Sequence, residues 1–250
     1  MRLPSSSCIA RAFLKCVLAS LLLVCAGVVR QPGRVEYPVQ RTPTLADIGQ
    51  QREPERITRK VSPPYTGDLS IFEDSKRDEK LQTERVMNIL GINEGSAVAD
   101  IGAGSGWFTV RAARRVADAG TVYAVDINDD YLKHIRERAK RENLSNIRTI
   151  LGTEDDPLLP RGSVDAVLLL KTYHEVAQPI RLLAHVRQAM RPGAKLGIID
   201  RNGRGDDHGI DSKTVIDEAD RAGFELVEQY DFVKSDQVDY FLVFRARPEG

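Results

Sequence analysis

The chain contains very little cysteine, and all of it lies near the N-terminus. Only three cysteines occur in 250 residues, at Cys8, Cys16 and Cys25. Because no cysteine follows position 25, the rest of the chain can form neither a disulfide framework nor a cysteine-based metal site. A body free of cysteine is compatible with an oxidising compartment but does not require one.

A surplus of charge of one sign is also missing. The 36 lysine and arginine residues are matched by 36 aspartate and glutamate residues, so the formal net charge is zero. Proteins that hold nucleic acids or membrane surfaces through bulk charge need a clear excess of basic residues. We therefore expect no nucleic-acid partner.

An apolar run long enough to cross a bilayer, about 20 residues, is missing as well. The shorter run at residues 16–29 follows three basic side chains, Arg2, Arg11 and Lys15. A basic segment followed by a short apolar run is the pattern of a signal peptide. We expect residues 1–29 to be a signal peptide or membrane anchor, so that the protein is exported or associated with the membrane. A cytoplasmic protein is the alternative.

Two further regions follow this segment. Residues 30–69 are rich in proline and arginine and keep no apolar period, which predicts a linker or an arm lying over a domain. Residues 70–250 alternate between two kinds of segment. The expected strands are 97–101, 121–127, 146–151, 163–170, 194–200, 225–233 and 239–246. The expected helices are 76–90, 105–117, 129–142, 179–190 and 212–222.

The apolar pattern of these strands predicts their arrangement. Near-continuous apolar strands separated by helices are typical of a parallel sheet covered by helices on both faces. The last two strands have no helix between them, which predicts an antiparallel pair. We therefore expect an α/β domain over residues 70–250.

The strongest local signal is the segment VADIGAGSGWFTV, residues 98–110. Asp100 ends an apolar strand there. Three glycines then lead into a helix, at Gly102, Gly104 and Gly106. Glycine permits the sharp turn and lets a ligand approach the backbone with no Cβ in the way, while the helix start offers free N–H groups. The segment predicts a binding loop.

The glycine spacing and two acids indicate which ligand this loop binds. Nicotinamide dinucleotides favour G-x-G-x-x-G, whereas the sixth position here is Trp107. The Asp100 carboxylate would repel a diphosphate but suits the cationic amino group of an aminoacyl sulfonium ligand. Asp126 ends the second strand, 20 residues after Gly106. A carboxylate there can accept hydrogen bonds from both hydroxyls of a ribose.

With these residues in place, the chain resembles the class I, Rossmann-like S-adenosylmethionine-dependent methyltransferase superfamily over about residues 80–246. The matching segments are VADIGAGSG, VYAVDI, LGTEDDPLLPRGSVDAVLLL and MRPGAKLGIID. The resemblance implies a doubly wound, three-layer α/β/α fold, with a mostly parallel seven-stranded sheet and an antiparallel last strand. It also implies S-adenosylmethionine as cofactor and methyl transfer by in-line displacement to an unidentified acceptor, a small molecule or another partner.

The resemblance also implies which residues contact the cofactor. The first acid and the glycine loop hold the methionine part, and the second acid holds the ribose. The segment after the third strand flanks the adenine, where the family often has Asp and this chain has Thr153. The implied contacts are Asp100, Gly102, Ala103, Gly104, Gly106, Asp126, Ile127, Thr153, Glu154, Asp155 and Lys171.

The segment LLLKTYHEV ends the fourth strand, where ligands bind in open α/β sheets. Many superfamily members have Asp or Asn near Lys171, and YHE resembles a bacterial subset of predicted methyltransferases with an N-terminal signal segment. His174 is the first candidate for a catalytic base, with Tyr173 and His208 behind it. A hydrogen-bonded structural histidine at a helix start is the alternative. Glu175 is expected to be an acid of a first helical turn.

A polar, glycine-rich loop, residues 201–211, follows the fifth strand and suits a substrate-facing position. His208 lies there among Asp206, Asp207 and Asp211. Their spacing is not that of a standard metal site, so no metal is expected.

Two other functions remain open. One is an NAD-dependent oxidoreductase, which the glycine spacing disfavours. The other is a non-catalytic nucleoside-binding protein that has kept the pocket and lost turnover, for which Lys171 leaves room. The sequence determines neither the acceptor nor the oligomeric state.

Overall fold

One seven-stranded sheet organises the part of the chain that the computed structural model describes, residues 55–57 and 59–248. The expected signal or anchor segment, residues 1–29, lies outside the described residues. The strands are β1 (Ala97–Ile101), β2 (Thr121–Asp126), β3 (Ile147–Leu151), β4 (Val164–Leu170), β5 (Met190–Asp200), β6 (Phe224–Tyr230) and β7 (Tyr240–Ala246). The helices are η1 (Leu69–Phe72), α2 (Arg77–Leu81), α3 (Thr83–Leu90), α4 (Trp107–Val116), α5 (Asp129–Arg141), η2 (Tyr173–Glu175), α6 (Pro179–Ala189), α7 (Ser212–Arg221) and η3 (Phe232–Asp236).

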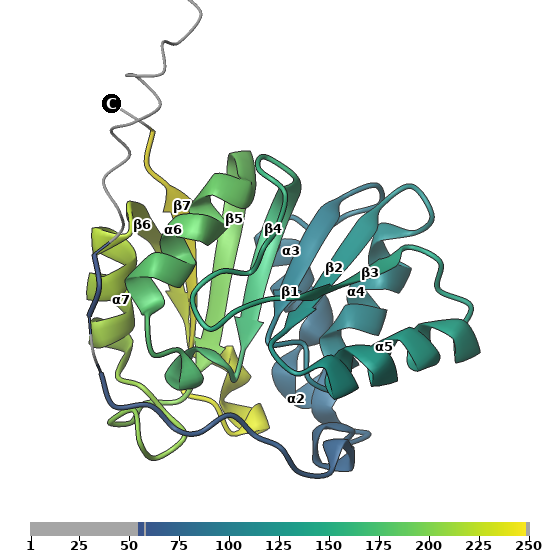
Figure 1. Ribbon diagram of the computed structural model, residues 1–250, viewed down its shortest axis with the longest axis horizontal. Coiled ribbons are helices and arrows are strands. Elements are labelled where there is room, and N and C mark those ends of the chain that lie inside the picture. The colour runs from purple at the N-terminus through teal and green to yellow at the C-terminus, as the bar shows by residue number, and fades with distance from the viewer. Residues whose placement is uncertain (1–54, 58, 249–250) are drawn as a thin grey trace, which may run out of the picture. The chain divides into compact units, whose positions relative to one another are not determined.

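The strand order is β3-β2-β1-β4-β5-β7-β6 (Figure 1). Strands β1 to β5 pair in parallel, and β7 runs antiparallel between β5 and β6. The expected fold, a mostly parallel seven-stranded sheet with an antiparallel last strand, is therefore confirmed. Because successive strands extend outward in opposite directions from β1 and β4, the gap between these two strands is the topological switch point where α/β proteins bind ligands.

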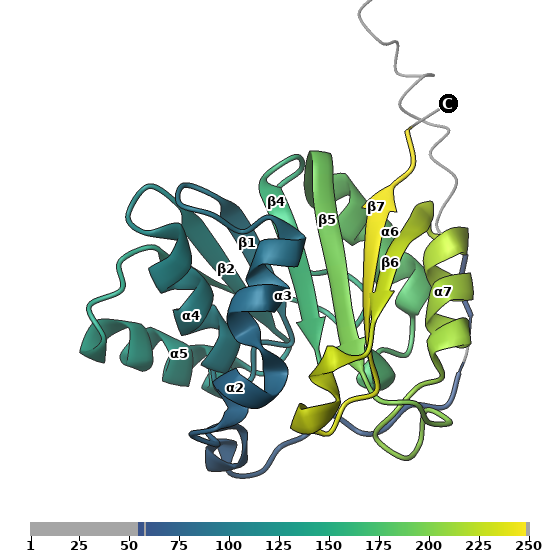
Figure 2. The same ribbon diagram turned by 180° about the vertical axis from the view of Figure 1, so that it is seen from behind.

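Helices cover both faces of the sheet, which gives the three expected layers. Helices α6 and α7 bury their apolar sides with β4, β5 and β7 on one face, seen in front in Figure 1. Helices α3 and α4 do the same on the other face, seen in front in Figure 2. Central strand β1 is buried along its whole length, as its apolar sequence AVADI requires.

The helix expected over residues 76–90 is divided in two. Gln82 has left-handed backbone angles, φ 53° and ψ 53°, and separates α2 from α3. Leu81 and Val86 are five residues apart, so a continuous helix would point them about 140° away from each other. With the break at Gln82, both side chains are completely buried. Burial of both apolar side chains is therefore favoured over a continuous helix.

Residues 59–69 of the predicted arm lie against the domain. Residues 59–72 run along the edge where the parallel strands end (Figure 1). The Arg59 guanidinium donates to the Val176 carbonyl at 2.9 Å and pairs with the Glu218 carboxylate at 2.7 Å. The Tyr65 ring packs edge-on against Phe72 with 5.4 Å between centroids. The arm therefore covers part of the sheet edge at which the parallel strands end.

Candidate functional site

A cavity of about 530 Å³ opens at the switch point, over the carboxyl ends of β1, β2 and β4. Its wall combines the glycine loop, the residues that follow β2 and β3, the segment after β4, and the arm. Because this is where ligands bind in open α/β sheets, the cavity is the candidate functional site.

The glycine loop forms the floor of this cavity. The amides of Gly102 and Ala103 donate to the Val125 carbonyl at 2.9 and 3.0 Å, which ties the loop to the end of β2. Gly102 has φ 72°, and a Cβ on it would lie 2.2 Å from the side chain of Thr172. Gly104 has φ 53° but would meet no protein atom within 4 Å. The loop therefore closes tightly at Gly102 and leaves open space above Gly104 for a ligand.

Asp100 lies at the end of β1 and lines the cavity, although only 2% of its surface is exposed. The Thr109 hydroxyl donates to its carboxylate at 2.6 Å. Burial raises the pKa of Asp100 to about 6, against the opposing effect of that hydrogen bond. A buried carboxylate of this kind is stabilised by a cationic group that enters the cavity.

Asp126 ends β2 and faces the same cavity. Its two carboxylate oxygens accept hydrogen bonds from the backbone amides of Gly104 at 2.9 Å and Asn128 at 3.0 Å. Burial raises its pKa, and these backbone amides oppose the rise. A carboxylate has about four acceptor positions, so it can also accept from hydroxyls of a ligand. The cap of α5 is Asn128, which accepts from the Asp130 amide at 3.0 Å, so Asp126 is not needed for capping.

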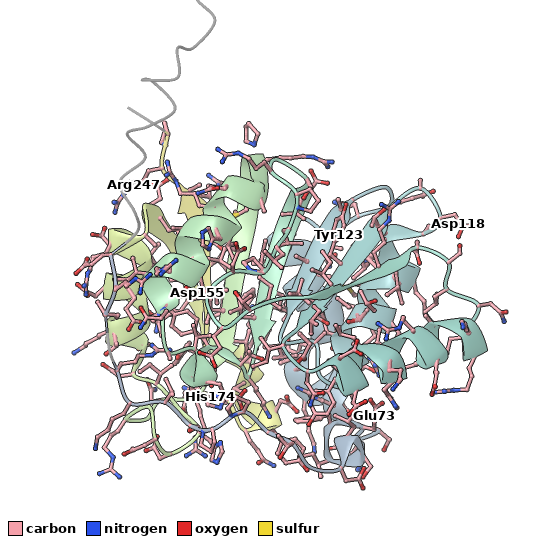
Figure 3. All side chains as sticks on the ribbon, viewed as in Figure 1. Glu73, Asp118, Tyr123, Asp155, His174 and Arg247 are labelled. Atoms are coloured by element: carbon pink, nitrogen blue, oxygen red, sulfur yellow. The ribbon has the colours of Figure 1, made fainter. Side chains whose placement is uncertain are left out.

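The other expected cofactor contacts are Ile127 after β2 and the segment after β3, and they lie only partly in the cavity. Ile127 lines the cavity and is 46% exposed, which is unusual for a large apolar side chain and suits contact with a flat ring. Thr153 and Glu154 also line it. Asp155 does not; its carboxylate lies 3.2 Å from Arg181 Nε of α6. Figure 3 shows Asp155 next to α6, well above the edge where His174 lies.

Lys171 and Trp107 line the cavity with side chains already engaged by the protein. Lys171 Nζ donates to the Asp236 carbonyl at 2.6 Å, and burial lowers its pKa. Trp107 is 2% exposed and lies between the guanidinium groups of Arg77 and Arg111, at 4.4 and 4.0 Å from its ring centroid. Trp107 therefore packs against two cationic side chains. Gly106, the remaining loop glycine, caps α4 outside the cavity wall.

Residues 173–175, which follow β4 after Lys171 and Thr172, form the one-turn 3₁₀ helix η2, and their side chains point in different directions. Tyr173 is fully buried, and its hydroxyl donates to the Glu218 carboxylate at 2.8 Å. His174 is 5% exposed, and its Nδ1 lies 2.9 Å from Asp200 Oδ1. Glu175 alone of the three lines the cavity. A 3₁₀ helix turns about 120° per residue, which accounts for the three directions.

Glu175 is a titratable cavity residue whose position the sequence does not predict. It was interpreted as a helix-terminal acid, whereas burial at the cavity wall raises its pKa to about 7. Its sequence neighbourhood offers no sign of this, because the facing of η2 depends on tertiary contacts. The structure also brings His208 to this place, with its ring centroid 5.8 Å from that of His174. Side-chain ligand atoms of His174, Glu175 and His208 all lie within 4.8 Å of one another, and none of the three aspartates near His208 in sequence belongs to that group.

The arm closes one side of the cavity. Val61, Pro64, Tyr65 and Thr66 line it. The Tyr131 hydroxyl of α5 donates to the Tyr65 carbonyl at 2.7 Å. The Ser62 hydroxyl, completely buried, donates to the Gly205 carbonyl at 3.0 Å and accepts from the His208 amide at 2.8 Å. The arm thus connects both sides of the cavity through α5 and the loop after β5.

Comparison with known proteins gives a match to a methyltransferase domain over part of the chain. Residues 98–193 match the model of a methyltransferase domain family. Demethylmenaquinone methyltransferase of Listeria welshimeri is 26% identical over 145 residues, which cover 58% of this chain and 61% of the relative. The chain thus spans about three fifths of the curated relatives it matches.

Solved structures show the same fold. An S-adenosylmethionine-dependent methyltransferase from Aquifex aeolicus superposes with a TM-score of 0.64 at 24% identity, covering 72% of this chain and 98% of its own. A sarcosine dimethylglycine methyltransferase from Galdieria sulphuraria, described as putative in its name, has a TM-score of 0.58 at 13% identity, covering 76% and 94%. At these identities the likeness concerns the fold.

Proposed function

We propose that this chain, whose residues 98–193 match a methyltransferase domain family, is an active enzyme that transfers the methyl group of S-adenosylmethionine to a small-molecule acceptor. The observation that carries the proposal is the cavity at the switch point, where Asp100 and Asp126 flank a glycine loop with open space above Gly104. Neither acid suits a diphosphate, and together they suit an amino acid joined to a nucleoside.

The cavity residues divide between the parts of the cofactor. Asp100 offers a buried carboxylate to the amino group of the methionine part. Asp126 offers its remaining acceptor positions to the ribose hydroxyls, and Ile127 offers an exposed apolar side chain to the adenine ring. Of the two acids that follow Thr153, Glu154 is the one at the cavity, where it can accept from the adenine amino group. Asp155 is held by Arg181 and is left out of the proposal.

The protein contributes mainly position to the reaction. The sulfonium of the cofactor supplies an activated methyl group, so the enzyme has to hold the acceptor in line with the carbon–sulfur bond. Such proximity and orientation can lower a barrier by roughly 7–11 kcal/mol. The arm supports this role, because Tyr65 and Thr66 line the cavity and would limit the access of water to it.

An acceptor hydroxyl, thiol or amine must also lose a proton. Lys171, directly after β4, donates to the Asp236 carbonyl. Beyond it, the titratable groups at this place include Glu175 at the cavity wall, with His174 and His208 next to it. Tyr173 is separated from the cavity, since its hydroxyl bonds to Glu218 inside the core. We therefore place the acceptor beside Glu175, and we assign removal of its proton to Glu175 together with the neighbouring His174.

Binding and turnover test the proposal separately. Isothermal titration calorimetry should detect binding of S-adenosylmethionine and of its demethylated product, and no binding of NAD⁺. NAD⁺ binding would support the oxidoreductase instead. Release of labelled methyl to an acceptor from a metabolite extract should accompany cofactor binding. Cofactor binding with no transfer to any acceptor pool would support a non-catalytic nucleoside-binding protein.

We also propose that residues 1–29 direct the domain to export or to the membrane. The support is their basic-then-apolar order. Among the described residues, no helix is long and apolar enough to span a membrane. An exported domain would need its charged cofactor delivered from the cytosol, because such a molecule does not cross a bilayer freely.

A further inference from the structure

We propose that His174, Glu175 and His208 bind a divalent cation of the zinc class at the wall of the cavity. Metal binding at this site is independent of the proposed function. The conclusion about the acceptor, drawn below, rests on the proposed function. The three side chains come from two separate places, η2 after β4 and the loop after β5, and only the fold brings them together.

The spacing of the ligand atoms is close to that of a zinc site. One atom from each side chain lies within 4.8 Å of the others, and His174 Nε2 is 3.9 Å from Glu175 Oε1. Tetrahedral bonds of about 2.0–2.1 Å put ligand atoms about 3.3–3.4 Å apart. The difference is small enough for side-chain rotation, because Glu175 has three rotatable bonds and His208 is exposed on a loop.

The donor set selects the kind of metal. Two imidazoles and one carboxylate form the His₂Glu combination typical of catalytic zinc, which leaves a fourth position for water or substrate. Calcium and magnesium prefer sites built from oxygen ligands. The set therefore favours zinc and neighbouring transition metals over the hard cations.

Asp200 supplies the outer contact that metal-binding histidines usually have. Its carboxylate oxygens lie 2.9 and 3.0 Å from His174 Nδ1, and the side chain is completely buried. A carboxylate there holds the proton on Nδ1, so Nε2 keeps the lone pair that binds metal. Asp200 also accepts from the His174 amide at 3.1 Å, which fixes the backbone as well as the ring.

His208 is held in place by a strained backbone and by the arm. It has φ 57°, a left-handed value that costs energy for a residue other than glycine. The hydrogen bonds of Ser62 to the His208 amide and the Gly205 carbonyl stabilise that conformation. An exposed histidine could lie free in solvent, but here the loop is bent so that its ring reaches His174. The adjacent carboxylates of Asp200 and Glu175 would balance the charge of a divalent cation.

A cation at this position would determine the class of acceptor. Because Glu175 lines the cavity, the fourth position is within reach of a bound acceptor. A hydroxyl or thiol that binds zinc loses its proton to water more readily. The acceptor oxygen or sulfur then bonds to the methyl carbon while the carbon–sulfur bond of the sulfonium breaks and its electron pair stays on sulfur. We infer that the acceptor is an alcohol, phenol or thiol.

Metal binding by the full-length, untagged chain tests the site directly. The protein is stripped with EDTA and titrated with Zn²⁺ by calorimetry, and with Co²⁺ by visible absorption. We expect one equivalent of metal whose Co²⁺ spectrum is that of nitrogen and oxygen ligands. His208→Gln and His174→Gln should each lower the affinity at least tenfold, and Asp200→Asn about 10–100-fold, as for other outer-shell partners. His134→Gln is the matched control, because His134 on α5 is outside the cluster.

Each outcome decides the proposal. The three N-terminal cysteines can also bind zinc, but their contribution is equal in all variants and adds sulfur bands to the Co²⁺ spectrum. Equal affinity in His208→Gln and His134→Gln overturns the site, and so does stronger binding of Mg²⁺ than of Zn²⁺. Thermal unfolding verifies that His208→Gln, a change at an exposed loop position, still folds. No cofactor is present in these titrations, so failure of methyl transfer and failure of metal binding are seen independently.

Discussion

Replacing Asp100 with asparagine should separate the cost of burying this carboxylate from its use in binding. Burial raises its pKa from 3.8 to about 6. One pKa unit corresponds to about 1.36 kcal/mol, so the ionised side chain lowers the free energy of unfolding by roughly 3 kcal/mol. Burial of the ionised carboxylate therefore lowers the stability of the fold.

The direction of the pH dependence follows from the raised pKa. The folded state holds the Asp100 proton more tightly than the unfolded state, so protonation stabilises the fold fully below the unfolded pKa of 3.8. This stabilisation is lost as the pH rises through about 6. A single site with these values contributes about 1.4 kcal/mol at pH 5 and almost nothing at pH 8. Asp100→Asn cannot titrate, so it lacks this contribution.

Urea unfolding followed by the fluorescence of Trp107, the single tryptophan, measures the effect at both pH values. The stability of Asp100→Asn relative to the wild type should rise by about 1.4 kcal/mol from pH 5 to pH 8. Asp130→Asn, at an exposed position on α5, should show no such change. A stability difference between Asp100→Asn and the wild type that is the same at both pH values would refute the reasoning.

The same variant should bind the cofactor poorly. Loss of the carboxylate removes a hydrogen bond between charged groups worth roughly 1.5–3 kcal/mol, which is at least about tenfold in affinity at pH 8. Urea unfolding should therefore show that the variant gains stability relative to the wild type at pH 8, and calorimetry should show that it binds the cofactor less tightly. Unchanged affinity would mean that Asp100 does not meet the cofactor's amino group.

Four other results are expected. Asp126→Ala should weaken cofactor binding by roughly 1.5–3 kcal/mol in calorimetry, with Asp130→Ala unchanged; equal affinities would remove Asp126 from the ribose site. His174→Ala should lower the rate of methyl transfer more than the cofactor affinity, and full activity toward the true acceptor would make His174 structural. Arg59→Ala leaves the buried Glu218 without its cation, so thermal unfolding should show a loss of roughly 3–5 kcal/mol and proteases should cut the arm faster; an unchanged melting temperature contradicts this. A C-terminal reporter that is active only outside the cytosol should be active on the full chain and silent without residues 1–29; silence of the full chain, found in the cytosolic fraction, contradicts export.

The sequence by itself determined the scaffold and the cofactor side of the cavity. Strands β1 and β4 are predominantly apolar, AVADI and VDAVLLL, which predicts buried central strands. The glycine loop and the acids Asp100 and Asp126 were predictable because their roles depend on the ends of adjacent parallel strands, which always meet at one edge. The structure places both acids at the cavity, as that rule requires.

Tertiary structure alone decided the acceptor side, because its residues are positioned by contacts distant in sequence. Tyr173, His174 and Glu175 are neighbours in a 3₁₀ turn, and only packing determines which one faces the cavity. The turn of His208 toward His174 depends on Ser62, 146 residues away in the chain. The local sequence pattern specifies which segments are strands and helices. The direction in which each side chain of a short turn points depends on contacts with residues distant in the sequence.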